Sequence, residues 1–175
     1  MRFNSLILAA AMVTGSASAT DFKGIELDKT YSNEAIQEKA GYQLGYDLGN
    51  SIRCKAYCSG QIKLGDGTSR ANFFPNKDGS IGDIEVITNV RDFDAIEKQL
   101  IEKFGRPSHV TRQALQNAFG AKVLNTFDEW HRPNGDEITL FRYIDMESGS
   151  LSLKSAKFIA ADKAFRAAKV KGGSI

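Results

Sequence analysis

The chain has 175 residues, of which 42% are hydrophobic and 25% are charged, and this composition excludes an intrinsically disordered protein. Lys and Arg total 23 against 21 Asp and Glu, a formal net charge of +2, which gives no reason to expect a nucleic-acid-binding protein.

The first 19 residues have the pattern of a secretory signal peptide. A basic residue follows Met1, residues 6–13 are apolar, and the small residues at 17–19 are those that a signal peptidase recognises. We expect cleavage between Ala19 and Thr20. The apolar stretch is too short to span a bilayer, and no cysteine follows the cleavage point to carry a lipid anchor. The sequence therefore predicts a periplasmic or secreted protein that is soluble after cleavage.

Residues 20–175 have the length of a single domain, and their first half predicts one helix followed by strands. Thr30, Ser32 and Asn33 offer capping oxygens at the start of a helix that runs to about Leu48, with apolar residues every four positions. Residues 76–80, Asn-Lys-Asp-Gly-Ser, are typical of a hairpin turn. Asp21–Leu27 and Ile81–Val90 are expected to be strands, and Ser51–Cys58 and Ser69–Phe74 are short segments separated by turns.

The second half repeats this order. Asp92 or Asp94 is expected to cap a helix that ends at Gly105, before Pro107. Residues 111–119 are predicted to form a further short helix, closed by Gly120. Strands over 121–130, 137–145 and 151–153, a hairpin turn over 132–136, a terminal helix over 157–168 and a loose tail from about 171 complete the chain. We therefore expect an α+β fold, an antiparallel sheet with helices packed on one face, built as two helix-then-hairpin units.

Cys54 and Cys58 are the two cysteines of the chain. In an oxidising compartment such a close pair is expected to form a disulfide. An extended strand would hold their Cα atoms about 13 Å apart, too far for a bridge, so a bridge requires a turn, a bulge or a helical loop between them. Thioredoxin-like redox sites separate their cysteines by two residues, and this pair is separated by three. We therefore interpret the pair as a structural clip.

Gly41, Gly45 and Gly49 lie four residues apart in the first predicted helix and leave one of its faces open to close approach by a neighbouring backbone. Close packing of this helix on the sheet is the simplest interpretation. The same stretch resembles the helical dimerisation segment of exported FKBP-type peptidyl-prolyl isomerases, in which a Tyr-x-x-Gly-x-x-x-Gly pattern occurs. The aromatic pocket motifs of the isomerase domain are missing from this sequence, so the resemblance does not extend to the activity.

Two arrangements of polar residues resemble metal sites. Asn76, Asp78, Gly79 and Glu85 match positions of an EF-hand calcium loop, but Phe74 stands where its first acidic ligand belongs. A hairpin turn explains the same residues. The two histidines, at positions 109 and 131, have no set of further ligands at zinc-binding spacing. We predict no metal site.

The sequence also lacks the usual catalytic motifs. It contains no Gly-x-Ser-x-Gly elbow, no P-loop and no dinucleotide-binding fingerprint. Asp128, Glu129 and His131 flank Trp130, but the alternation of a strand sends Asp128 and Trp130 to one face and the other two to the opposite face. We therefore predict no catalytic residue and no cofactor, which favours a protein that is not an enzyme.

The end of the chain is basic. From Lys154 onward there are six Lys or Arg residues against Asp162 alone. A solvated helix face is the simplest interpretation, and contact with anionic lipid or with an acidic partner is the alternative.

Gly24-Ile25-Glu26-Leu27 before a capped helix, and Leu100-Ile101-Glu102-Lys103-Phe104-Gly105-Arg106-Pro107 before hairpins, resemble the arrangement of two kinds of small exported α+β protein. These are the β-lactamase-inhibitor-protein type and the small lipoprotein of the outer-membrane assembly machine. The resemblance consists of the element order and a Lys-Phe-Gly-x-Pro helix end, and the lipoprotein cysteine is missing. It implies an extracytoplasmic domain that binds another protein through its sheet face or its loops.

The first functional hypothesis is therefore a non-catalytic protein-binding module of inhibitor or immunity type, whose partner is another envelope protein. The alternatives are an envelope enzyme or folding factor, suggested by the isomerase-like helix, and a structural envelope component whose basic terminal helix docks on lipid. The sequence alone assigns neither the partner-binding residues nor the oligomeric state.

Overall fold

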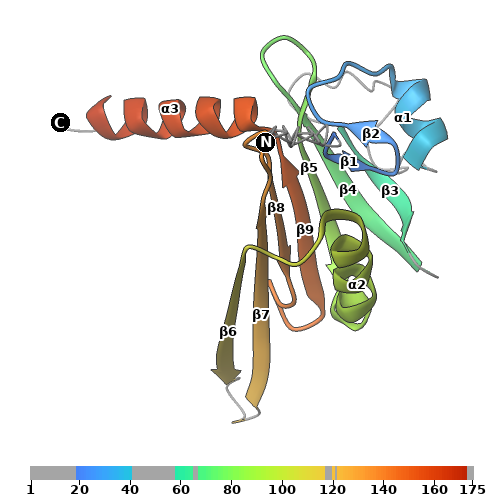
Figure 1. Cartoon of the computed structure of the whole chain (residues 1–175), viewed down its shortest axis with the longest axis vertical. Coiled ribbons are helices and arrows are strands. Elements are labelled where there is room, and N and C mark those ends of the chain that lie inside the picture. Colours follow the sequence, from blue (N-terminus) through green and yellow to red (C-terminus); the bar gives the residue numbers. More distant parts are fainter. Residues whose placement is uncertain (1–18, 41–57, 65–66, 117–119, 121, 173–175) are drawn as a thin grey trace, which may run out of the picture.

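The computed structural model describes residues 19–40, 58–64, 67–116, 120 and 122–172 (Figure 1). In chain order its elements are β1 (Asp21–Phe22), β2 (Ile25–Glu26), α1 (Asn33–Ala40), β3 (Cys58–Leu64), β4 (Gly67–Pro75), β5 (Ile81–Asn89), the 3₁₀ turn η1 (Val90–Asp92), α2 (Phe93–Phe104), β6 (His109–Gln116), β7 (Lys122–His131), β8 (Glu137–Phe141), β9 (Ser148–Lys154) and α3 (Ala156–Gly172).

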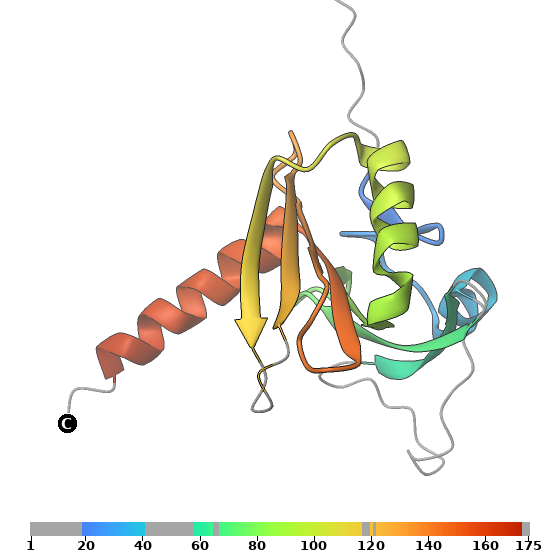
Figure 2. The same cartoon turned by 90° about the horizontal axis from the view of Figure 1, so that it is seen from below.

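Seven of the strands form one antiparallel sheet in the order β3-β4-β5-β9-β8-β7-β6, and β1 and β2 form a separate short hairpin. The last strand, β9, lies between β5 and β8 and so joins the half-sheet that follows α1 to the half-sheet that follows α2. The expected α+β architecture, with two helix-then-hairpin units, is confirmed. Figure 2 shows α1 and α2 on one side of the sheet, while α3 projects away on the other.

The core lies between α2 and the sheet, because the strands alternate apolar and polar residues. Ile84 of β5 pairs with Leu153 of β9, and Leu153 with Ile138 of β8. All three are buried, and α2 covers them with Phe93, Ile96 and Leu100. The residues next to them along the strands, such as Glu85, Ser152 and Thr139, form the opposite face, which is part exposed and which we call the open face.

Trp130 of β7 fixes the end of α2. Its side chain is 2% exposed, and its indole Nε1 donates a hydrogen bond of 2.8 Å to the carbonyl of Gly105. Gly105 follows α2 with a φ of 83°, and its amide bonds back to the carbonyl of Ile101. A left-handed residue at this position is what glycine accepts without steric cost, so the predicted end of the helix is confirmed.

The helix starts agree with the sequence only in part. The hydroxyl of Ser32 accepts a hydrogen bond of 3.2 Å from the amide of Ala35, as a capping residue should. At the second helix the capping side chain is Asn89, which accepts from the amide of Arg91 and starts η1. Asp92 precedes α2 without a side-chain capping bond, and the carboxylate of Asp94 pairs with Arg142.

Two predicted helices need correction. Residues 111–119 were expected to be helical, but His109–Gln116 is strand β6, and it pairs with β7 from His109 opposite Glu129 to Gln116 opposite Lys122. The terminal helix begins at Ala156 and extends to Gly172, past the predicted end at 168 and into the expected tail. The stretch Gly41–Gly49, on which the isomerase-like prediction depends, lies outside the described residues.

The first turn of α3 is fixed to the sheet. Buried Ser155 caps it, since its hydroxyl accepts from the amide of Phe158 at 3.1 Å. Asp136 accepts from the amide of Ala156 at 3.1 Å, and Lys157 forms an ion pair with Asp78. From residue 163 to residue 170 every side chain of the helix is exposed.

Candidate functional site

The hairpin of β6 and β7 ends in a group of apolar side chains. Leu115 near the end of β6 lies directly opposite Val123 near the start of β7. Since side chains alternate along a strand, both point to the same face as Phe127, which stacks on Phe141 with ring centroids 4.0 Å apart. This face is the open face of the sheet.

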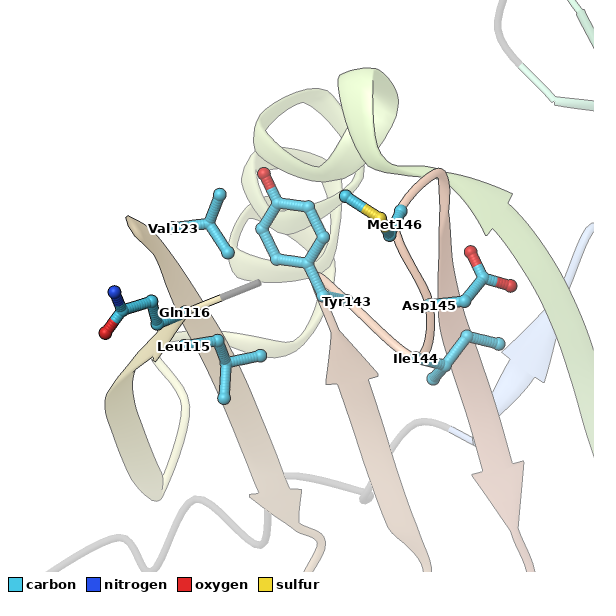
Figure 3. A pocket seen from close by; sticks show the side chains of 7 residues that line it. All are labelled: Leu115, Gln116, Val123, Tyr143, Ile144, Asp145 and Met146. Atoms are coloured by element: carbon cyan, nitrogen blue, oxygen red, sulfur yellow. The ribbon is translucent and has the colours of Figure 1, made fainter. Parts of the chain in front are cut away.

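Beside this hairpin end lies a hollow of about 310 Å³. Its lining residues are Leu115, Gln116, Val123, Tyr143, Ile144, Asp145 and Met146. Figure 3 shows the ring of Tyr143 between Val123 and Met146. The hollow therefore combines two elements: the hairpin end supplies one wall, and the turn between β8 and β9 supplies the other.

Hydrogen bonds hold that turn in place. The side-chain amide of Asn125 donates a hydrogen bond of 3.1 Å to the carbonyl of Tyr143. It also accepts one of 3.0 Å from the backbone N–H of Tyr143. The carboxylate of Asp145 accepts from the amides of Glu147 at 2.9 Å and Ser148 at 2.7 Å, and these bonds lower the pKa of Asp145. Asp145 is thus an ionised turn residue and has no arrangement for acid–base catalysis.

The rim of the hollow exposes large apolar side chains. The exposed fractions are 39% for Val123, 50% for Ile144 and 71% for Met146. Single exposed apolar residues are common on protein surfaces, but a group of them around a concave site is typical of a contact surface. The arrangement can accept an apolar side chain, and it presents no pair of groups suited to a nucleophile and its base.

The opposite face of β7 contains an unusual carboxyl group. Asp128 is fully buried beneath α2, and among the described residues neither of its carboxyl oxygens has a hydrogen-bond partner. Burial raises the pKa of Asp128 to about 6, Glu97 of α2 raises it further, and the charges of Arg112 and Arg142 oppose the shift. Asp128 does not line the hollow. Because it is buried in the core, its protonation state affects the free energy of unfolding.

A second hollow, of about 260 Å³, lies between α2 and the short hairpin of β1 and β2. Its charged lining residues include Asp21 and Lys103, whose carboxylate and ammonium groups lie 2.6 Å apart. Because Asp21 and Lys103 pair with each other, neither is free to bind a charged ligand in this second hollow. We therefore place the candidate site at the first hollow.

The residues that resembled a calcium loop form the hairpin turn after β4. The side-chain amide of Asn76 donates to the carboxylate of Asp28 at 2.9 Å and to the hydroxyl of Ser80 at 3.0 Å. Asp78 accepts from Ser80 and pairs with Lys157, which lowers the pKa of Asp78. Glu85 points elsewhere and accepts from Asn72 at 3.3 Å. These oxygens are engaged in the turn, which supports the hairpin interpretation.

The other candidate residues are not brought together. His109 lies near Thr111, with His109 Nε2 and Thr111 Oγ1 3.1 Å apart, and His131 lies near Glu137 at 3.7 Å. Within the described ranges no three His, Cys, Asp or Glu side chains form a group that could hold a metal ion. Strand alternation places Asp128 with buried Trp130, and Glu129 with His131 on the other face, as predicted.

The remaining sequence predictions are untested by the described coordinates. Cys54 lies outside the described residues, and Cys58 is described only as the first residue of β3, opposite Phe73. Ala19 is exposed and Thr20 is buried where the described chain begins. Sequence reasoning missed the hollow, because residues 111–119 were expected to be helical and residues 137–145 were expected to be one strand, whereas β8 ends at Phe141. The exposed run Ile144-Asp145-Met146 was the available signal.

No protein-family profile and no curated protein sequence matches the chain. Among solved structures, the crystal structure of a DUF4309 family protein (YjgB) from Bacillus subtilis subsp. subtilis str. 168 is similar at 14% identity and a TM-score of 0.40. The match covers 76% of this chain and 83% of that chain. A likeness at this level carries no inference about activity or partners.

Proposed function

We propose that this chain is a non-catalytic protein-binding module that acts after export, and that it contacts its partner through the hollow between the β6–β7 hairpin end and the β8–β9 turn. The partner is another envelope protein that offers an apolar side chain. The observation that carries the proposal is the exposed apolar rim, Val123, Ile144 and Met146, around a concave site.

The chemistry of the lining supports binding over turnover. Its ionisable side chains are Tyr143 and Asp145, and the Asp145 carboxylate already accepts two backbone hydrogen bonds. Covering exposed apolar area gains about 25 cal/mol per Å². An apolar anchor that fills a pocket is the usual energetic centre of a protein–protein interface. Inhibitor-type and immunity-type proteins work in this way, without chemistry of their own.

The export part of the proposal rests on the leader-like residues 1–19 and the cleavage point between Ala19 and Thr20. Among the described helices, none is long and apolar enough to cross a membrane.

The test compares two variants that remove equally exposed apolar side chains. Met146→Ser changes the rim of the hollow, and Val170→Ser changes the far part of α3, where the exposed fraction of Val170 is 77%. The tagged chain is incubated with periplasmic extract and the stoichiometry of retained protein is measured. We expect wild type and Val170→Ser to retain one partner at equal molar amounts, and Met146→Ser to retain about tenfold less. Equal retention by all three chains, or turnover of a small substrate, would contradict the proposal.

A second candidate function is favoured by one observation on α3. Its outer part is basic through Lys163, Arg166 and Lys169, and it exposes Phe165 and Val170. Arg166 is paired with Asp162 at 2.8 Å, whereas among the described residues neither Lys163 nor Lys169 has an ion-pair partner. Free positive charge beside exposed apolar groups suits the surface of an anionic membrane.

A further inference from the structure

We propose that the partner binds as an extended segment that pairs with the free edge of β6 and adds an eighth strand to the sheet, with one apolar side chain packed on Leu115 at the rim of the hollow. This inference rests on the proposed function, and it specifies the chemical class of the partner.

The backbone of β6 is available for pairing. Among the described strands, β6 is the last of the sheet and its hydrogen-bonded neighbour is β7 alone. In an antiparallel sheet alternate residues direct their N–H and C=O groups to opposite sides. About half of the backbone groups of β6 therefore point away from β7. All its side chains except Val110 and Leu115 are exposed. An extended peptide is the ligand whose donors and acceptors match such a row.

The edge has one of the features that usually block strand addition, the charge of Arg112 on the covered face, and it lacks the others. Natural edges are protected by proline, by bulges, by inward-pointing charges or by very short strands. The sequence of β6, His-Val-Thr-Arg-Gln-Ala-Leu-Gln, contains no proline or glycine. Its pairing with β7 runs in continuous register over the whole strand. Arg112 is its one Lys or Arg residue. A regular, uncapped edge in an exported protein is therefore best explained by a strand that covers it.

The hollow selects the side chain at one position of the added strand. Leu115 belongs to β6 itself and also lines the hollow. A residue paired with Leu115 points to the same face, because directly opposite side chains in an antiparallel pair share a face. Its side chain therefore packs on Leu115 at the rim of the apolar hollow, where a leucine, isoleucine, valine or phenylalanine fits best.

Arg112 selects a second position. It is exposed, and no ion pair joins it to any described residue; its charge acts only at longer range on Asp128. Since it lies three residues from Leu115, it points to the opposite face of β6. A carboxylate on the partner residue opposite Arg112 would form a cross-strand ion pair. A partner strand antiparallel to β6 passes Leu115 before it passes Arg112, so its apolar residue precedes its acidic residue by three positions. The expected motif is therefore apolar-x-x-Asp/Glu.

The test uses random peptides displayed on phage, selected on the chain comprising residues 20–175. We expect enrichment of apolar-x-x-Asp/Glu peptides without helical periodicity. The enriched peptide is then synthesised, together with versions N-methylated at each of two successive residues. One of the two methyl groups falls on an N–H that faces β6, so one version should bind about tenfold more weakly and the other should not. Equal binding of both versions would overturn the strand-addition geometry.

Two variants test the motif. Arg112→Glu should shift the enriched motif to apolar-x-x-Lys/Arg, whereas Arg106→Glu, an exposed arginine outside the strand, should leave it unchanged. Circular dichroism checks that both fold. An unchanged motif in Arg112→Glu would contradict the assigned register. Concentration-dependent dimers whose β6 amides become protected from hydrogen exchange would also overturn the inference, because the edge would then be covered by a second copy.

The outcomes separate this inference from the function on which it rests. If Met146→Ser loses the periplasmic partner and the β6 amides stay unprotected in the complex, the protein-binding function stands and the strand addition is wrong. If the partner is retained equally by every variant, the proposed function fails. Slower hydrogen exchange at alternate β6 amides, together with partner loss in Met146→Ser, supports both.

Discussion

Asp128 is the residue whose ionisation opposes folding most directly. It is fully buried and its pKa, about 6, exceeds its ordinary value of 3.8. Between these values the folded chain binds more protons than the unfolded chain. The contribution of Asp128 to the free energy of unfolding is therefore largest below pH 4 and declines by about 2–3 kcal/mol as the pH rises through 6. Asp83 has the same sign, since burial raises its pKa to about 6 against the opposing effects of Lys154 and Ser152.

We expect Asp128→Asn to raise the free energy of unfolding above pH 7 by about 2 kcal/mol and to flatten its decline between pH 4 and pH 7. Urea denaturation at several pH values measures both effects. Asp78→Asn is the matched control of opposite sign, because Lys157 lowers the pKa of Asp78. Asp78→Asn should lower the free energy of unfolding above pH 4 and have little effect in acid, where the wild-type carboxylate is already protonated. A pH profile of Asp128→Asn that coincides with wild type would show that folding does not shift the pKa of Asp128.

At the scale of the elements, β6 shows why local sequence was insufficient. Residues 111–119 contain arginine, glutamine, alanine and leucine, which favour helices. The structure nonetheless makes His109–Gln116 a strand, because β7 offers continuous pairing partners for all of it. Such a partner lies outside the local window, so tertiary pairing overrode local propensity. The same error hid the hollow, since Leu115 lines it only when β6 is extended.

Where periodicity was strong, the sequence predicted the elements well. α2 follows its apolar pattern at Phe93, Ile96 and Leu100, and it ends before Gly105 as expected. β5 and β7 agree within one residue with the strands expected at 81–90 and 121–130. The identity of the capping residue was less predictable, because Asn89, Asp92 and Asp94 all carry suitable oxygens, and the pairing of Asp94 with Arg142 is a tertiary contact that the local sequence does not show.

For α3 we expect binding to vesicles that contain phosphatidylglycerol, and weaker binding as the salt concentration rises. Each basic residue near an anionic surface contributes about 1 kcal/mol. Reversing two charges, Lys163→Glu with Lys169→Glu, should therefore lower the bound fraction in flotation by at least about tenfold. The control Lys77→Glu with Lys122→Glu makes the same change in net charge on exposed residues outside α3. If both double variants float like wild type, α3 is a solvated helix.

At the scale of the whole molecule, the sheet has two unlike faces. Its covered face holds the core beneath α2, and its open face mixes polar residues with apolar ones such as the stacked pair of Phe127 and Phe141. Composition and turn spacing predicted this two-layer arrangement, since alternating strands joined by tight turns need a cover on one side only. The direction in which α3 leaves the sheet was not predictable, because it depends on contacts with residues more than seventy positions earlier, at Gly82 and Asp78.

The compartment predicts the covalent state of the chain. We expect the exported protein to begin at Thr20, and Cys54 and Cys58 to resist alkylation until a reductant is added. Replacing both cysteines by serine should lower the free energy of unfolding by about 2 kcal/mol. Reduced wild type serves as the control and should match the double variant. An uncleaved chain in the cytosolic fraction with both thiols reactive would refute the prediction.

Because only the first turn of α3 is fixed to the sheet, a small tilt there produces a larger displacement at the far end of the helix. In Gly82 of β5 an added methyl carbon would lie 2.5 Å from the ring of Phe158 and 2.6 Å from Oδ1 of Asn76, so only a residue without a side chain lets the helix root sit this deeply. At 1.5 Å per residue the tip lies about 20 Å beyond Phe158, and a tilt of a few degrees at the root swings it by an ångström or more. The direction of the basic helix α3, which follows β9 at the end remote from the hollow, therefore depends on the absence of a side chain at Gly82 in β5.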